Sequence, residues 1–211
     1  MLSRRHLRAR ASYLTQILVL LIPLLCCKFT WADHSPWRIP LPQRLSDQNT
    51  KVSFEVDSTW HLVKGETSGI TGDLWLANPR DQLSVRAKLQ IPVARFNTHG
   101  ESRDERMREV MDSERSPNVI ILIDSVSPQC SVDVFRNGGE CKAILQARIK
   151  IRGHERVMEL HGALNRNSKQ MTLSGKAVFG WAEFGVEDPS ILVAKLDPNV
   201  KVSFLVSLPV N

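Results

Sequence analysis

Residues 83–91, LSVRAKLQI, alternate apolar and polar side chains without a break. Because successive side chains of a strand point to opposite faces, this period of two predicts a β-strand with one apolar face. An apolar face of this kind must be covered, so the strand is expected in an antiparallel sheet that packs on a second sheet or closes on itself.

The same period recurs along most of the chain beyond residue 48. The other runs that predict strands are 52–56, 143–151, 157–164, 171–179, 191–195 and 200–208. Residues 119–123 are continuously apolar, which is typical of a strand covered on both faces. Residues 65–76 are expected to form a turn leading into another strand, with Gly69 and Gly72 allowing a bend or bulge. Roughly eight or nine short strands predict a single all-β domain, and the periodicity does not choose between a sandwich and a barrel.

Residues 97–117, NTHGESRDERMREVMDSERSP, interrupt this alternation with a charged segment. Thr98 followed by Glu101 matches a capping box, and a helix starting there must end before Pro117. Apolar residues recur at helical spacing on one face: Met107, Val110 and Met111. A helix of about ten residues is too short to be stable alone. We therefore expect one short α-helix that lies across an open end or face of the sheet.

The first 32 residues have the features of a secretory signal peptide. A basic start containing Arg4 and Arg5 precedes the apolar run 17–27 and a small-residue cleavage site at Ala32. The run is shorter than the roughly 20 residues that a spanning helix needs, so a retained anchor is the weaker alternative. The mature protein is expected to be periplasmic or secreted, with residues 33–47 as an extended leader and 48–211 as the folded domain.

The charge of the mature chain excludes a nucleic-acid surface. The full chain has 28 basic and 22 acidic residues, and five of the basic but none of the acidic ones lie in residues 1–32. That leaves 23 basic against 22 acidic residues, without the excess of positive charge that nucleic-acid binding requires.

Two cysteines remain beyond the signal peptide, Cys130 and Cys141. In an exported chain this favours one disulfide over two free thiols. If Asn137 and Gly138 formed a tight hairpin turn, Cys130 would lie roughly 13 Å from the position opposite Cys141. A disulfide does not span that distance. We therefore expect residues 131–140 to form a wider loop closed at its neck by the sulfurs.

The sequence has no motif of catalysis, and we predict neither an enzyme, nor a cofactor, nor a metal site. Hydrolase elbows, zinc-binding H-E-x-x-H and C-x-x-C motifs are all missing from the sequence. An enzymatic alternative requires Asp104, Glu183 and His99 to meet in one pocket. Large aromatic and Met side chains near the strands either fill the core or line an elongated cavity suited to acyl or prenyl chains. They are Trp60, Trp75, Trp181, Phe54, Phe179, Phe204, Met107, Met111, Met158 and Met171.

The order of several motifs resembles the YceI-like family of exported lipid- and polyisoprenoid-binding proteins. The motifs are VSF (52–54), GETSGITGDL (65–74), THGESRDERM (98–107), SPNVIILI (116–123), ILQARIKIRG (144–153) and GWAEFGVEDP (180–189). The resemblance implies an extended eight-stranded antiparallel β-barrel, similar to lipocalins, that holds a long isoprenoid chain. Arg103 and Asp104 match positions of the family's motif. The resemblance leaves open whether they anchor the helix or contact the ligand. The family's late arginine and aspartate are Trp181 and Glu183 here, which affects head-group contacts more than the fold.

The resemblance leads to a function and a set of contact residues. We expect periplasmic binding of a polyisoprenoid or quinone-like lipid, for carriage or sequestration. Burial of a prenyl chain is worth on the order of 10 kcal/mol before ordering costs. The inward residues that would contact it, each of which could equally be plain core, are Phe54, Val56, Leu89, Leu145, Ile149, Met158, Leu160, Phe179 and Phe204.

The alternative is a structural or interaction module of the cell envelope with a filled core and no ligand. Contact with a membrane surface or an envelope protein fits both hypotheses, and a homodimer is left open. An apolar cavity inside the sheet would favour the lipid-binding hypothesis.

Overall fold

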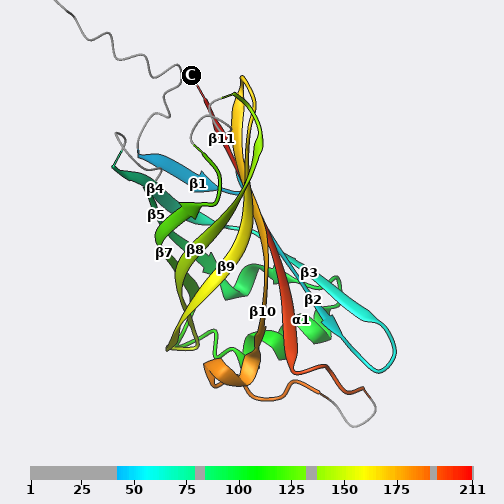
Figure 1. Ribbon diagram of the computed structural model, residues 1–211. Coiled ribbons are helices and arrows are strands. Elements are labelled where there is room, and N and C mark those ends of the chain that lie inside the picture. Colours follow the sequence, from blue (N-terminus) through cyan, green and yellow to red (C-terminus); the bar gives the residue numbers. More distant parts are fainter. Residues whose placement is uncertain (1–41, 79–83, 132–136, 191–193, 211) are drawn as a thin grey trace, which may run out of the picture. The chain divides into compact units, whose positions relative to one another are not determined.

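The structure is a computed structural model that describes residues 42–78, 84–131, 137–190 and 194–210 (Figure 1). All of these belong to the compact unit Pro36–Asn211. The predicted signal peptide and residues 33–41 of the predicted leader lie outside the described residues. Within the described ranges, no helix is long and apolar enough to cross a membrane.

The described residues form eleven strands, one α-helix and two 3-10 helices, which confirms the all-β class with one short helix. The helices are α1 (Glu101–Val110), η1 (Val93–Arg95) and η2 (Trp181–Phe184). The strands are β1 (Gln43–Ser46), β2 (Thr50–Asp57), β3 (Leu62–Thr67), β4 (Thr71–Asn78), β5 (Ser84–Pro92), β6 (Phe96–Asn97), β7 (Asn118–Pro128), β8 (Glu140–Ile151), β9 (His154–Arg166), β10 (Gln170–Gly180) and β11 (Asn199–Pro209).

The strands form one antiparallel sheet in the order β1-β4-β5-β7-β8-β9-β10-β11-β2-β3-β6, curled into a half-barrel (Figure 1). The expected eight-stranded closed barrel is not confirmed, because the described residues give eleven strands and an open order that ends at β1 and β6. The number is higher than expected because short interruptions divide the chain at three places: residues 47–49, residues 68–70 and η1.

The sheet begins earlier in the chain than the predicted domain boundary. Gln43–Ser46, which the sequence assigned to the leader, form β1 and pair with β4, and Leu45 is buried in the core. Asp47 joins the interruption at 47–49 to the one at 68–70. Its carboxylate accepts hydrogen bonds from the backbone N–H groups of Gly69 and Ile70, both at 2.8 Å. Gly69 has a φ of 71°, a conformation that favours glycine.

The structure does not test the predicted strand 191–195, because residues 191–193 lie outside the described residues. Leu196 makes only an isolated bridge to Ser58. Every other predicted run overlaps an observed strand.

A disulfide joins the end of β7 to the start of β8 and confirms the predicted pair. The Cα atoms of Cys130 and Cys141 are 5.6 Å apart. Beside it, the Gln129 N–H donates to the Lys142 carbonyl at 2.7 Å, so the two strands are joined at the neck of the loop. Residues 132–136 of that loop lie outside the described residues.

Candidate functional site

A cavity of about 400 Å³ lies on the inner face of the sheet, beside α1 and η2. Its volume falls within the roughly 300–1,000 Å³ that is usual for ligand pockets. Strand residues supply about half of its wall: Val52, Phe54, Val56, Val63, Thr67, Ile91, Phe96, Val119, Ile121, Ile149, Ile151, Phe179, Val200 and Val202. The wall is apolar because alternate residues of each strand face inward.

Phe54 shows how the strands shape this wall. It is paired with Gly65 across β2 and β3. A Cβ atom on Gly65 would lie 2.2 Å from the Phe54 ring, so only glycine leaves room for the ring at this position. The ring then packs against Phe96, with 5.7 Å between ring centroids.

The helix α1 supplies a second wall. Met107, Val110 and Met111 line the cavity, as the helical spacing predicts. The predicted capping box is wrong, because Gly100 is the N-cap residue and no side chain caps the helix.

Thr98 is instead held by the first turn of α1. Its N–H and hydroxyl donate to the Asp104 carboxylate at 2.8 and 2.7 Å. The Arg103 guanidinium donates to the Thr98 carbonyl at 2.9 Å and, from Nε, to its hydroxyl at 3.3 Å. Asp104 is only 9% exposed. Through these bonds to Thr98, both Arg103 and Asp104, which match the family's motif, anchor α1 to the end of β6.

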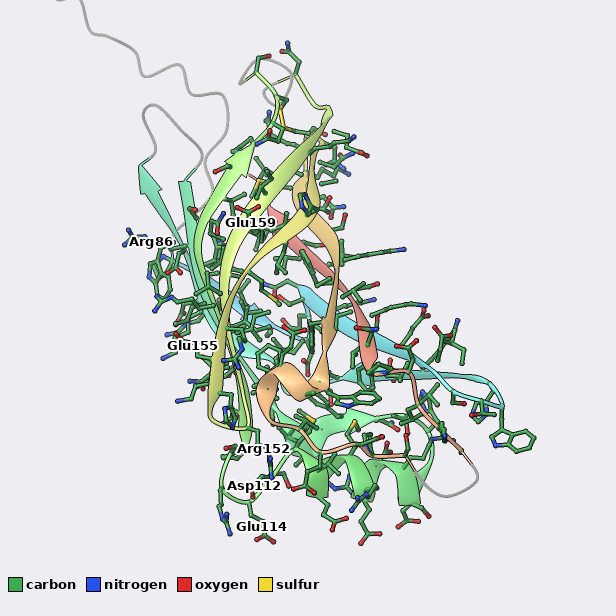
Figure 2. The ribbon with its side chains drawn as sticks, turned by 60° about the horizontal axis from the view of Figure 1, so that its bottom comes forward. Arg86, Asp112, Glu114, Arg152, Glu155 and Glu159 are labelled. Atoms are coloured by element: carbon green, nitrogen blue, oxygen red, sulfur yellow. A yellow bond between two sulfur atoms is a disulfide. The ribbon has the colours of Figure 1, made fainter. Side chains whose placement is uncertain are left out.

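The helix η2 supplies the third wall. Phe184 is fully buried and packs edge-on against Phe179, with 5.3 Å between ring centroids. Figure 2 labels Arg152, which comes from the turn between β8 and β9. Its guanidinium bonds to the carbonyl of Gly185 and lies 3.3 Å from the Glu187 carboxylate. These contacts fix the end of η2 to the sheet.

A few polar side chains also line the cavity. Arg103, Ser102 and Arg106 come from α1, and Ser58 and His61 come from the turn between β2 and β3. Arg106 is paired with Glu109 at 2.7 Å. The arrangement offers an apolar interior that suits a hydrocarbon chain and a few side chains that can form hydrogen bonds.

The electrostatic pairs with shifted pKa values lie away from the cavity wall. Arg148 donates two hydrogen bonds of 2.8 Å to Asp124 and lowers the pKa of that carboxyl. Asp57 lies 2.7 Å from the Lys201 ammonium and raises the pKa of that amine. Both pairs are on the exposed face of the sheet.

The residues of the enzymatic alternative have separate partners. Asp104 bonds to Thr98, Glu183 accepts from the Gly180 N–H at 2.8 Å, and His99 lies 3.9 Å from Glu66. Within the described ranges, no group of three His, Cys, Asp or Glu side chains could hold a metal ion.

The nine predicted contact residues divide between the cavity and the packed core. Four of them line the cavity: Phe54, Val56, Ile149 and Phe179. Five belong to the core cluster or pack against it: Leu89, Leu145, Leu160, Met158 and Phe204. Their role as ligand contacts stays a prediction. Sequence reasoning missed Phe184 and Val186, which lie in or after a 3-10 helix, where the period of two gives no signal.

Solved structures similar to this one show the same fold. BcnA of Burkholderia cenocepacia has a TM-score of 0.60 and 15% identity, over 77% of this chain and 96% of that chain. A polyisoprenoid binding domain from Saccharophagus degradans, implicated in plant cell wall breakdown, has a TM-score of 0.62 and 13% identity, over 80% and 97%. The Campylobacter jejuni YCEI protein has a TM-score of 0.54 and 14% identity, over 70% and 84%.

Among curated proteins, no sequence matches this chain. The family model of the YceI-like domain matches residues 44–208, from β1 to the end of β11. This match includes every strand and helix that encloses the cavity. The chain therefore belongs to the YceI-like domain family.

Proposed function

We propose that this protein binds one long hydrophobic lipid, a polyisoprenoid or quinone-like molecule, and carries or sequesters it in the periplasm or outside the cell. The observation that carries this proposal is the apolar cavity of about 400 Å³ beneath α1. A well-packed protein interior has few voids larger than a water molecule, so a cavity of this volume fits a ligand-binding role better than a filled core.

The similarity to the Saccharophagus degradans domain supports the same ligand class by analogy, since the two chains share the fold at 13% identity. The signal-peptide features of residues 1–32 support export. Binding, rather than catalysis, is the proposed activity, because apolar burial alone can hold a prenyl chain.

The pairing of the interrupted strands supports an enclosed lipid site. β1 continues into β2 after three residues, β3 into β4 after three, and η1 joins β5 to β6. β3 pairs with β2 and β6, while β4 pairs with β1 and β5. If each interruption acts as a bend in one long strand, these pairs close an eight-stranded barrel around the cavity. An enclosure of this kind would keep water from the bound chain.

A binding assay with a cavity-filling variant tests the proposal. Radiolabelled polyprenol is added to the mature protein and co-elution is measured by gel filtration. The parent should carry about one lipid per chain, and Ile121→Trp, which fills the cavity, should carry at least about tenfold less.

The matched control introduces a tryptophan on the outer face of the sheet instead of in the cavity. Val157 is exposed on the outer face of β9, so Val157→Trp should bind as the parent does. A parent that carries neither polyprenol nor ubiquinone would contradict the proposal and favour an envelope module without a ligand.

A further inference from the structure

The turn between β2 and β3 exposes two large apolar side chains at the edge of the cavity. Trp60 is 70% exposed and Leu62 is 38% exposed. A tryptophan can bury roughly 150–250 Å², so an indole left this exposed forgoes much of the stabilisation that burial would give. Single exposed apolar residues are common on protein surfaces, but three features of this turn indicate a specific use.

First, the turn is held rigidly by hydrogen bonds. The Ser58 N–H donates to the His61 carbonyl at 3.2 Å, and the Ser58 hydroxyl donates to the same oxygen at 2.5 Å. On the other side, the Thr59 N–H donates to the Lys195 carbonyl at 2.9 Å, and the Lys195 N–H donates to the Thr59 hydroxyl at 3.2 Å. Trp60 therefore projects from a fixed turn.

Second, both segments that these bonds join line the cavity. Ser58, His61 and Val63 come from the hairpin, and Ala194 and Leu196 come from the segment before β11. Figure 1 shows the β2–β3 hairpin and this segment extending on the same side of α1. The exposed indole is thus held beside residues that line the cavity.

Third, the acidic side chains of β2 next to the turn are paired with basic ones. Glu55 is paired with Lys64 of β3 at 3.5 Å, and Asp57 is paired with Lys201 of β11 at 2.7 Å. A docking surface for an anionic partner would present an excess of basic side chains. The balance instead fits the interface of a bilayer, which tryptophan favours because its ring is apolar and its N–H is polar.

We propose that the β2–β3 turn docks on a lipid bilayer through Trp60 and Leu62 and brings the edge of the cavity to the head-group region. A lipid then passes between bilayer and cavity without crossing water. This inference rests on the proposed lipid-binding function, and it adds where and how the lipid is exchanged.

Flotation with phosphatidylcholine vesicles tests the docking step. Trp60→Ser should reduce vesicle binding about tenfold, since binding at an interface scales with the apolar area inserted, and Leu62→Ser should reduce it less. Trp75→Ser is the matched control, because Trp75 is 42% exposed on β4 and lies outside the cavity wall. The control should float as the parent does. Each variant should keep the melting temperature of the parent.

The second measurement separates docking from lipid capacity. Transfer of radiolabelled polyprenol from vesicles to Trp60→Ser should be slower, while polyprenol added from solvent should bind in the parent amount. If neither the parent nor Trp60→Ser binds polyprenol added from solvent, the proposed lipid-binding function is contradicted. The flotation experiment tests membrane docking separately, because it does not depend on polyprenol.

Several results would overturn the docking proposal. Flotation of Trp60→Ser at the parent level is one, and an equal loss in Trp75→Ser is another. Binding that requires anionic lipid and disappears in high salt would indicate charge attraction instead. A Trp60→Ser variant that changes only self-association in analytical ultracentrifugation would identify a second copy of the chain as the partner.

Discussion

The two ends of the sheet's inner face have the same alternating sequence pattern, but only one of them is densely packed. At the end that carries the disulfide, a cavity of only about 20 Å³ lies among the core side chains. At the end beside α1, the space is about 400 Å³. The packed end is bordered by Leu74, Val126, Leu164, Met171, Leu173, Val206 and Leu208.

Glycines contribute to the close packing at the first end. A Cβ atom on Gly162 would lie 2.6 Å from the Ser174 carbonyl, and one on Gly175 would lie 2.4 Å from the Phe204 ring. At the other end, α1 and η2 cover the sheet and leave the cavity beneath them. The comparison indicates a division of roles, in which the packed end stabilises the fold and the other end binds.

The largest expected effect is on the packed end. Leu164 is 2% exposed, and Leu164→Ala should lower the free energy of unfolding by about 3–5 kcal/mol, since it removes buried carbon and leaves a void. Val202→Ala, in the cavity wall, should cost about 1 kcal/mol or less. Urea unfolding of both variants checks this, and equal losses would contradict the division of roles.

Removal of the disulfide should have the next largest effect. The double variant Cys130→Ser with Cys141→Ser should lose about 3 kcal/mol of stability in the chain-entropy model, because the unfolded chain is no longer restrained. Polyprenol binding at the other end should stay at the parent level when measured well below the melting temperature. A large loss of binding in the folded variant would show that the two ends are coupled.

Loss of the helix anchor should have an intermediate effect. Asp104→Ala leaves the Thr98 N–H and hydroxyl without their acceptor, which should cost about 1–3 kcal/mol. Because α1 forms part of the cavity wall, polyprenol binding should weaken as well. Glu105→Ala is the control, since Glu105 is exposed on the same helix. Unchanged binding in folded Asp104→Ala would show that the position of α1 does not matter for the ligand.

Sequence pattern predicted the helix and most of the strands, because alternation and helical spacing are local properties, but it assigned the residues of β1 to the leader. It was not enough to locate the cavity. Phe54 and Phe204 both alternate inward and both face a glycine across the sheet, Gly65 and Gly175 respectively. One ring lines the cavity, while the other packs against the core. Whether a ring lines a cavity or packs in the core depends on which side chains cover it, and those side chains come from residues distant in sequence.

The anchor of α1 shows a second limit of the sequence. The spacing of Thr98 and Glu101 matched a capping box, but Asp104 takes the hydrogen bonds of Thr98 instead. In a capping box the Glu101 carboxylate would accept the hydrogen bond from the Thr98 N–H. The Asp104 carboxylate, in the first turn of the same helix, accepts it instead, so spacing alone did not decide between the two. Phe184 was missed because 3-10 geometry places it inward without any strand period.

The smallest expected effect is the pH dependence of an ion pair on the outer face. Arg148 lowers the pKa of Asp124 in the folded state. The pair therefore stabilises the fold above the unfolded pKa of the carboxyl, and this contribution is lost as the pH falls through the folded value. Thermal melts of the parent and Asp124→Asn should differ slightly at neutral pH and converge in acid.

Salt provides the control for this pair. Because both side chains are exposed, the difference should also shrink at about 1 M salt, where the screening length is roughly 3 Å. A difference that persists in acid or in high salt would contradict the assignment of the effect to this pair.

Native mass spectrometry of the protein purified from its own host tests the central claim most directly. The parent should show a second peak, heavier by the mass of one lipid per chain, and Ile121→Trp should show only the peak of the protein alone. A parent with the protein peak alone, both as purified and after incubation with polyprenol, would contradict the account.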